Sequence, residues 1–182
     1  KNFRNEGMDR NHNPEYTSLE YYQAYADLYS MMDLTENLFR YVAENTGELS
    51  FKYAGNKIDL SQPFNKKSMF SLLQEYADTD ISGMDVLALN ELAQSKSIEL
   101  PEALNYGQVL DKLFGEIVEP KLIEPTFVTD YPKAVSPLAK DNRNGKTDIV
   151  ERFELFIAGM EFANSFSELN DPGEQRKRLE AQ

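Results

Sequence analysis

The chain reads Phe3-Arg4-Asn5-Glu6-Gly7 close to its start, then His12-Asn13-Pro14-Glu15-Tyr16-Thr17, then Glu20-Tyr21-Tyr22. Residues 3–7 are typical of a strand end. Arg4 and Glu6 are two positions apart, so their side chains project from the same face of that strand. The polar residues 8–15 predict a hairpin loop, and the aromatic residues 16–26 predict the returning strand. A strand-end arginine and glutamate next to an aromatic strand suit a site for a nucleotide triphosphate and a cationic small molecule.

Beyond this region the hydrophobic period becomes helical, and it predicts a first helix from Leu28 to about Gly47. The other predicted helices are 68–76, 82–96, 105–118 and a last one from Pro172 to the end, where proline suits the first turn. Ser82 with Asp85 predicts a capping-box variant. The other predicted strands are 49–53 and 57–60, which form a hairpin, then 126–128, 152–157 and 160–168. Residues 64–119 are rich in predicted helices, whereas the segments on either side contain the predicted strands, so residues 64–119 predict a helical insertion.

Length and composition limit the possible classes of protein. With 182 residues and 41% hydrophobic content, the chain suits one domain, or a core plus a smaller insertion. There is no run of about 18 apolar residues, so no membrane span is expected. The absence of cysteine excludes disulfides and thiolate metal sites and fits a cytoplasmic protein.

The charge and the first residues add two expectations. A net charge of −12 disfavours a broad basic face for nucleic acid on this segment. The first residues lack both a starting methionine and an apolar signal region, and they resemble a strand. We therefore expect a piece of a longer protein.

Arg4, Glu6 and His12 are the first candidate site residues. Arginine binds phosphate or carboxylate through a bidentate fork, although Arg4 and Glu6 also fit a cross-strand ion pair. His12 is the only histidine, so a metal site built from several histidines of this chain is excluded. In a polar loop, His12 fits either phosphate binding or an ordinary solvated turn.

Glu154 and Glu161 form the second candidate group. A two-residue turn at Ala158-Gly159 would place Phe156 opposite Glu161. The two glutamates then share a face as diagonal neighbours, with their Cα atoms roughly 7–8 Å apart. Carboxylates at this spacing can hold Mg²⁺ on a triphosphate, and they also fit two solvent-facing side chains.

Asn164, Phe166 and Glu168 alternate onto one face and form the third candidate group. An amide, an aromatic ring and a carboxylate on one wall suit a ligand with an ammonium group, although Phe166 also fits an ordinary core position. Simple alternation puts this set opposite Glu161. If all four line one site, a β-bulge must lie between Glu161 and Asn164.

These segments resemble a known family. The chain resembles motif 2 of class II aminoacyl-tRNA synthetases, in the lysyl-tRNA synthetase form, at residues 3–7, 12–17 and 20–27. The resemblance continues, in the same order, through Glu124–Pro132, Ser136–Lys140, Arg152–Phe156 and Asn164–Pro172. It covers the whole chain, with residues 48–119 matching only in general character.

The resemblance implies an α+β fold, with an antiparallel sheet flanked by helices and a helical insertion. It implies a lysine–tRNA ligase that joins L-lysine to ATP, releases pyrophosphate and passes the lysyl group to tRNA(Lys), with Mg²⁺ as cofactor. The family works as a homodimer. Motif 1, motif 3 and the anticodon-binding domain are not found in the chain, so we expect it to be inactive alone and to leave most tRNA binding to other parts of its parent.

The resemblance also assigns roles to residues. Arg4, the catalytic residue, contacts the α-phosphate of ATP and the lysine carboxylate. The other implied ATP contacts are Glu6 at adenine, His12 and Asn13 near the outer phosphates, and Tyr16 stacking on adenine where the family usually has phenylalanine. Glu154 and Glu161 are the implied Mg²⁺ ligands. The implied lysine pocket contains Glu20, Tyr22, Asn164, Phe166 and Glu168, with Tyr22 and Glu168 closest to the ε-ammonium.

One local departure is Ala158-Gly159-Met160, where the family often has Gly-Gly-Arg. Two other readings stay open: a paralogue that lysylates a protein, and a non-catalytic module on the same fold. Aspartyl and asparaginyl synthetases share the fold, but Glu20 and Glu168 argue against an acidic or polar substrate.

Overall fold

The computed structural model describes residues 1–5, 7–9, 12–146 and 148–180. The helices are α1 (Leu28–Thr46), α2 (Met69–Ala77), α3 (Val86–Ser95), α4 (Tyr106–Ile117) and α5 (Pro172–Glu180), with short 3-10 helices η1 (Glu119–Lys121) and η2 (Lys133–Val135). The strands are β1 (Asn2–Phe3), β2 (Glu15–Tyr16), β3 (Ser50–Tyr53), β4 (Asn56–Asp59), β5 (Asn65–Ser68), β6 (Thr126–Thr129), β7 (Arg152–Ile157) and β8 (Met160–Phe166).

The main sheet has four strands in the order β5-β6-β7-β8. The α+β class is confirmed, but the expectation of a wholly antiparallel sheet is wrong, because β5 runs parallel to β6. β5 was not predicted, since its polar sequence carries no alternating hydrophobic pattern. It is a strand because its backbone pairs with β6.

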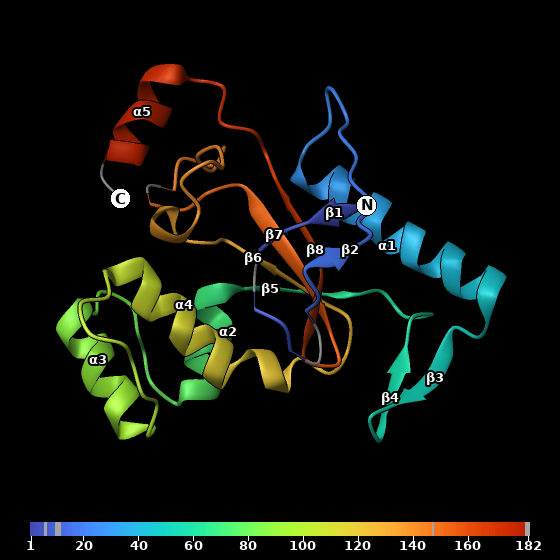
Figure 1. The fold of residues 1–182 in the computed structure, drawn as a ribbon, viewed down its shortest axis with the longest axis horizontal. Coiled ribbons are helices and arrows are strands. Elements are labelled where there is room, and N and C mark those ends of the chain that lie inside the picture. The colour runs from blue at the N-terminus through green and yellow to red at the C-terminus, as the bar shows by residue number, and fades with distance from the viewer. Residues whose placement is uncertain (6, 10–11, 147, 181–182) are drawn as a thin grey trace.

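Two hydrophobic clusters cover the sheet. One joins α2, α3 and α4 to Val128 and Phe156, and the other joins α1 and the β3–β4 hairpin region to Phe127 and Phe153. Side chains alternate along a strand, so the clusters lie on opposite faces. Figure 1 shows α2, α3 and α4 gathered on one side of the sheet and α1 on the other.

The helix ends follow their capping residues. Asp27 caps α1 by accepting the Ser30 backbone N–H at 2.8 Å, and α1 ends at Gly47 as predicted. The capping of α3 by Ser82 is wrong: Asp85 is the N-cap and accepts the Ala88 N–H, so the helix starts later than expected. A carboxylate that reaches the third following N–H is a strong cap.

The predicted strand over residues 16–26 is also wrong. β2 contains only Glu15–Tyr16, because β1 offers only Asn2–Phe3 for pairing and a strand needs a paired neighbour to be stable. Tyr25 then takes a left-handed φ of 59°, which ends any extended run and turns the chain into α1. No helix in the part of the chain described above has the length and apolar character needed to cross a membrane.

Candidate functional site

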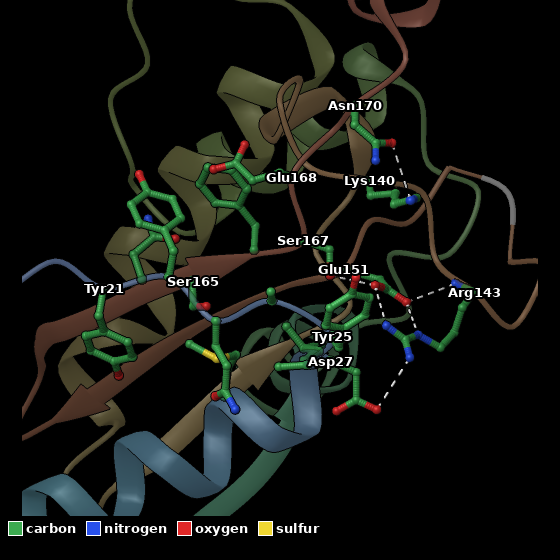
Figure 2. A pocket seen from close by; sticks show the side chains of 18 of the residues that line it. Tyr21, Tyr25, Asp27, Lys140, Arg143, Glu151, Ser165, Ser167, Glu168 and Asn170 are labelled. Carbon is green, nitrogen blue, oxygen red and sulfur yellow. Dashed lines mark hydrogen bonds and ion pairs between the residues drawn. The ribbon is translucent and has the colours of Figure 1, made fainter.

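A cavity of about 1040 Å³ lies between the segment that precedes α1 and the end of β8. It brings together five of the predicted residues: Glu20, Tyr22, Asn164, Phe166 and Glu168. Figure 2 shows Tyr21 and Asp27 from the first segment and Ser165 and Glu168 from the second. Residues far apart in the sequence therefore form one pocket, although the first segment is not the strand that was expected.

Tyr22 and Glu20 are joined by a hydrogen bond. The Tyr22 hydroxyl donates to Oε1 of Glu20 at 2.6 Å. This bond and the charge of Glu20 raise the pKa of Tyr22, and the charge of Glu168 adds to the rise. The two carboxylates from opposite walls thus act on the same hydroxyl, which makes this part of the pocket electronegative.

The segment before α1 is also tied to the helix behind it. The Tyr21 hydroxyl lies 3.0 Å from Oγ1 of Thr35, a buried residue of α1. Thr35 in turn donates to the Met31 carbonyl at 2.8 Å. Tyr21 is therefore fixed to α1, and the next residue, Tyr22, extends outward with 75% of its surface exposed.

The hairpin of β7 and β8 sets the positions of the acidic residues. Phe156 pairs with Glu161 across a turn at Ala158-Gly159, as predicted. The register then shifts, so that Glu154 pairs with Asn164. The predicted bulge between Glu161 and Asn164 is thereby confirmed, and it turns both residues to the same face of β8.

Among the predicted site residues that the structure describes, Glu154 is the most enclosed, with 8% of its surface exposed. Its Oε2 accepts the Tyr131 hydroxyl at 2.6 Å. Its Oε1 accepts Nη2 of Arg152 and, at 3.3 Å, Nδ2 of Asn164. Burial, followed by the adjacent Glu154 charge, raises the pKa of Tyr131 well above its ordinary value, so Tyr131 stays a donor.

Glu161 lies nearby in a more crowded acidic environment. The residue as a whole is exposed, but protein atoms surround much of its carboxyl group. This desolvation raises its pKa to about 7, and the charges of Glu154, Glu119 and Asp111 also act in that direction. Desolvation and the Glu154 charge raise the pKa of Glu119 as well. The region therefore carries more negative charge than its surroundings neutralise.

Arg152 links the acidic region to the pocket. Its Nε donates to Oδ1 of Asn164 at 3.3 Å, its Nη1 donates to Oγ of Ser136 at 2.7 Å, and its guanidinium lies 4.7 Å from the Tyr131 ring centroid. Sequence reasoning missed Arg152, although it lies two residues before Glu154 and alternation places both on one face. Tyr131 carried no such signal.

The other predicted residues lie outside the cavity lining. Arg4 is exposed, and its backbone N–H donates to the Pro14 carbonyl at 2.9 Å. The ring Nδ1 of His12 lies 2.8 Å from Oδ2 of Asp9. Asn13 accepts the Glu15 N–H at 3.3 Å, and Tyr16 pairs with Asn2 in the β1–β2 ladder. Glu6 lies outside the described residues.

The residues that could hold a metal are Glu154 and Glu161. Their carboxylate oxygens are the hard donors that Mg²⁺ prefers, and the unneutralised charge around Glu161 favours a cation. Within residues 1–5, 7–9, 12–146 and 148–180, no group of three or more His, Cys, Asp or Glu side chains is arranged to hold a metal ion. This pair could therefore hold Mg²⁺ only with further oxygen ligands.

Comparison with known proteins shows which family and which relatives the chain is similar to. The family described as tRNA synthetases class II (D, K and N) matches residues 1–182. A lysine–tRNA ligase of Christiangramia forsetii is 46% identical over 183 residues, covering 100% of this chain and 32% of the relative. One from a Nostoc species is 50% identical over 184 residues, covering 99% and 32%. One from Carboxydothermus hydrogenoformans is 46% identical over 181 residues, covering 98% and 37%. The chain spans about a third of the length of these curated relatives.

Proposed function

The chain belongs to the class II tRNA synthetases of the D, K and N group, and we propose that it forms part of the catalytic core of a lysine–tRNA ligase. The complete protein would activate L-lysine with ATP and transfer it to tRNA(Lys). The relatives named above carry that activity in their names. The segment alone would be inactive, because motif 3 and motif 1 would come from elsewhere in the protein.

The observation that carries this proposal is the pair of carboxylates in the pocket. Glu20 and Glu168 line the cavity from different walls, and both act on the Tyr22 hydroxyl. An ammonium group placed there would gain charge-assisted hydrogen bonds. A neutral or acidic side chain would leave the carboxylates unpaired, which is how a polar pocket rejects a wrong substrate.

In the proposed reaction, a carboxylate oxygen of lysine attacks the α-phosphorus of ATP, and the bond to pyrophosphate breaks. This step needs positioning and charge neutralisation more than proton transfer. Arg4 would bind both the α-phosphate and the lysine carboxylate, which its planar fork suits. Asn164 and Phe166 would hold the lysine backbone and side chain between the two carboxylates.

ATP would bind along the N-terminal hairpin. Glu6 would contact adenine, His12 and Asn13 would lie near the outer phosphates, and Tyr16 would stack on the base. A tyrosine ring offers the same π-face as phenylalanine. The His12 backbone N–H donates to Oδ1 of Asp9 at 2.8 Å, and the His12 ring Nδ1 lies 2.8 Å from Oδ2 of the same residue.

Mg²⁺ would be held by Glu154 and Glu161. Magnesium commonly takes one or two carboxylates and completes its shell with waters and substrate phosphates, so a set of two glutamates fits it. When bound, the ion supplies positive charge that offsets the charge growing on the phosphates. Arg152 and Tyr131 would orient the Glu154 carboxylate toward that position.

The wider setting is also a proposal. We infer a cytoplasmic homodimer that binds tRNA mainly through parts outside this segment. Residues 64–119 would be a helical insertion in the catalytic domain: they hold α2, α3 and α4, although β5 within them pairs with the main sheet. A protein acceptor in place of tRNA, or a non-catalytic module, are the alternatives.

The test is amino-acid-dependent ATP–pyrophosphate exchange by the full-length protein, with each of the twenty amino acids. We expect exchange with L-lysine alone. Charging of tRNA(Lys) would then separate a tRNA ligase from an enzyme that lysylates a protein. A folded full-length protein that exchanges with no amino acid would be a binding module, and exchange with aspartate or asparagine would refute the lysine assignment.

A further inference from the structure

The pocket has two walls that come from distant parts of the chain. One is the segment from Glu20 to Asp27, and the other is the end of β8 with the residues that follow it, up to Asn170. The first wall carries Glu20 and Tyr22, and the second carries Glu168. The distance between the walls therefore decides whether one ammonium group can reach both carboxylates.

A buried glutamate supports the second wall. Glu151 has 4% of its surface exposed, and it lies directly before β7. Its Oε2 accepts the Ser167 hydroxyl at 2.7 Å, next to Glu168, and its backbone carbonyl accepts the Ser167 N–H at 2.9 Å. Side chain and backbone of one residue thus fix the position of Ser167.

Arg143 binds this glutamate with a two-pronged contact. Its Nη2 donates to Oε2 of Glu151 at 2.9 Å, and its Nε donates to Oε1. The bond to Arg143 is the largest cause that lowers the pKa of Glu151, so the carboxylate stays ionised. A forked contact also fixes the guanidinium plane, since both hydrogen bonds must hold at once.

The remaining end of Arg143 reaches the first wall. Its Nη1 lies 3.4 Å from Oδ2 of Asp27, which is 116 residues away in the sequence and is the N-cap of α1. Figure 2 shows the Arg143 guanidinium between the Glu151 and Asp27 carboxylates at the edge of the pocket. One side chain therefore joins both walls.

We propose that Arg143 is a positioning residue that holds the two walls together, through its contacts with Glu151 and Asp27, and so sets the width of the amino-acid pocket. This inference rests on the proposed function, because it concerns selection of the lysine side chain. Arg143 need not touch the substrate. Two carboxylates balance its charge, so it does not repel an ammonium group bound between Glu20 and Glu168.

The test uses Asp27→Asn and Arg143→Gln in the full-length protein. Asparagine keeps the N-cap, because its side-chain oxygen still accepts the Ser30 N–H, but it removes the charge that faces Arg143. Asp85→Asn makes the same change at the N-cap of α3, outside the cavity lining, and is the matched control. Exchange kinetics give kcat and the KM values for lysine and ATP.

The wild-type protein is measured first, so a failure of the proposed function appears there as absent lysine-dependent exchange. We expect Arg143→Gln to raise the lysine KM roughly tenfold, since misplaced binding groups weaken binding steeply, and to leave the ATP KM within about twofold. Asp27→Asn should have a smaller effect in the same direction, and Asp85→Asn none.

The double variant decides between bridging and simple destabilisation. If Arg143 joins the walls, Asp27→Asn should change nothing further once Arg143 is glutamine, because the coupled contact is already lost. Unchanged lysine KM in Asp27→Asn and Arg143→Gln would overturn the proposal. Additive effects of the two substitutions, or an equal rise in the lysine and ATP KM values, would overturn it as well.

Discussion

The hydroxyl of Tyr131 donates to Oε2 of Glu154 at 2.6 Å, and both residues are buried. A buried carboxylate that loses a donor bears a desolvation cost, and a hydrogen bond to a charged group contributes about 1.5–3 kcal/mol. Tyr131→Phe keeps the ring under Arg152 and removes only the hydroxyl. We expect a loss of about 2 kcal/mol in the free energy of unfolding, measured with urea.

Tyr53→Phe is the matched control for that experiment. Tyr53 is exposed, and within the described part of the chain its hydroxyl donates to a weak acceptor, Sδ of Met160, at 3.9 Å. Its removal should change stability by less than about 0.5 kcal/mol. Equal effects of the two substitutions would contradict the importance of the Tyr131–Glu154 bond.

Glu161 should make stability depend on pH. Its folded-state pKa is about 7, above its ordinary value of 4.5. Between pH 4.5 and pH 7 the folded state therefore holds a proton that the unfolded state has lost. Stability then falls as pH rises through this window and levels off above about pH 7, because stability falls where the native state binds more protons. Glu161→Gln removes this contribution.

The measurement is urea unfolding of wild type and Glu161→Gln at pH 5 and pH 8, with a chelator present. The variant should gain stability relative to wild type on going from pH 5 to pH 8. A stability difference that is the same at both pH values would show that Glu161 has no raised pKa. Direct NMR titration of the Glu161 carboxyl group provides the same test without unfolding.

Ala158 occupies the first turn position between β7 and β8 with a left-handed φ of 54°. This conformation is unfavourable for residues with a Cβ and free for glycine. Its N–H bonds to the Ile123 carbonyl at 2.8 Å, which a glycine would keep. Ala158→Gly should therefore stabilise the protein by about 0.5–1 kcal/mol in urea unfolding.

Ala163 supplies the opposite control. It lies inside β8 and pairs with Leu155, where glycine is destabilising by about 0.5–1 kcal/mol relative to alanine. Ala163→Gly should lower stability while Ala158→Gly raises it. A loss of stability in both would refute the strain assigned to the turn.

Local signals predicted much of this fold and of the pocket. The ends of α1, the β3–β4 hairpin and the β7–β8 hairpin follow from caps, turn residues and hydrophobic period, which act within a few positions of each other. The bulge in β8 followed from requiring Glu161 and Asn164 to share a face. These inferences succeeded because short-range geometry decides them.

The rest depends on partners far along the chain. β5 carries no strand pattern and exists through its pairing with β6. Residues 17–26 have a strand composition but lack a paired neighbour in the described chain. The contact of Arg143 with Asp27 and that of Tyr131 with Glu154 join separate segments. Such tertiary contacts override local propensity, and no single stretch of sequence indicates them.

The central claim is that the pocket selects lysine by its ammonium group, and Glu168→Gln tests it most directly. The measurement is kcat/KM for ATP–pyrophosphate exchange by the full-length protein, with lysine and with norleucine, which lacks the ammonium group. Glu48→Gln, at an exposed residue after α1 and outside the cavity lining, is the control. We predict that Glu168→Gln weakens activation of lysine by about 2–4 kcal/mol, because a charge-assisted contact is lost, and leaves norleucine unchanged. Lysine kinetics equal to those of wild type would contradict the account.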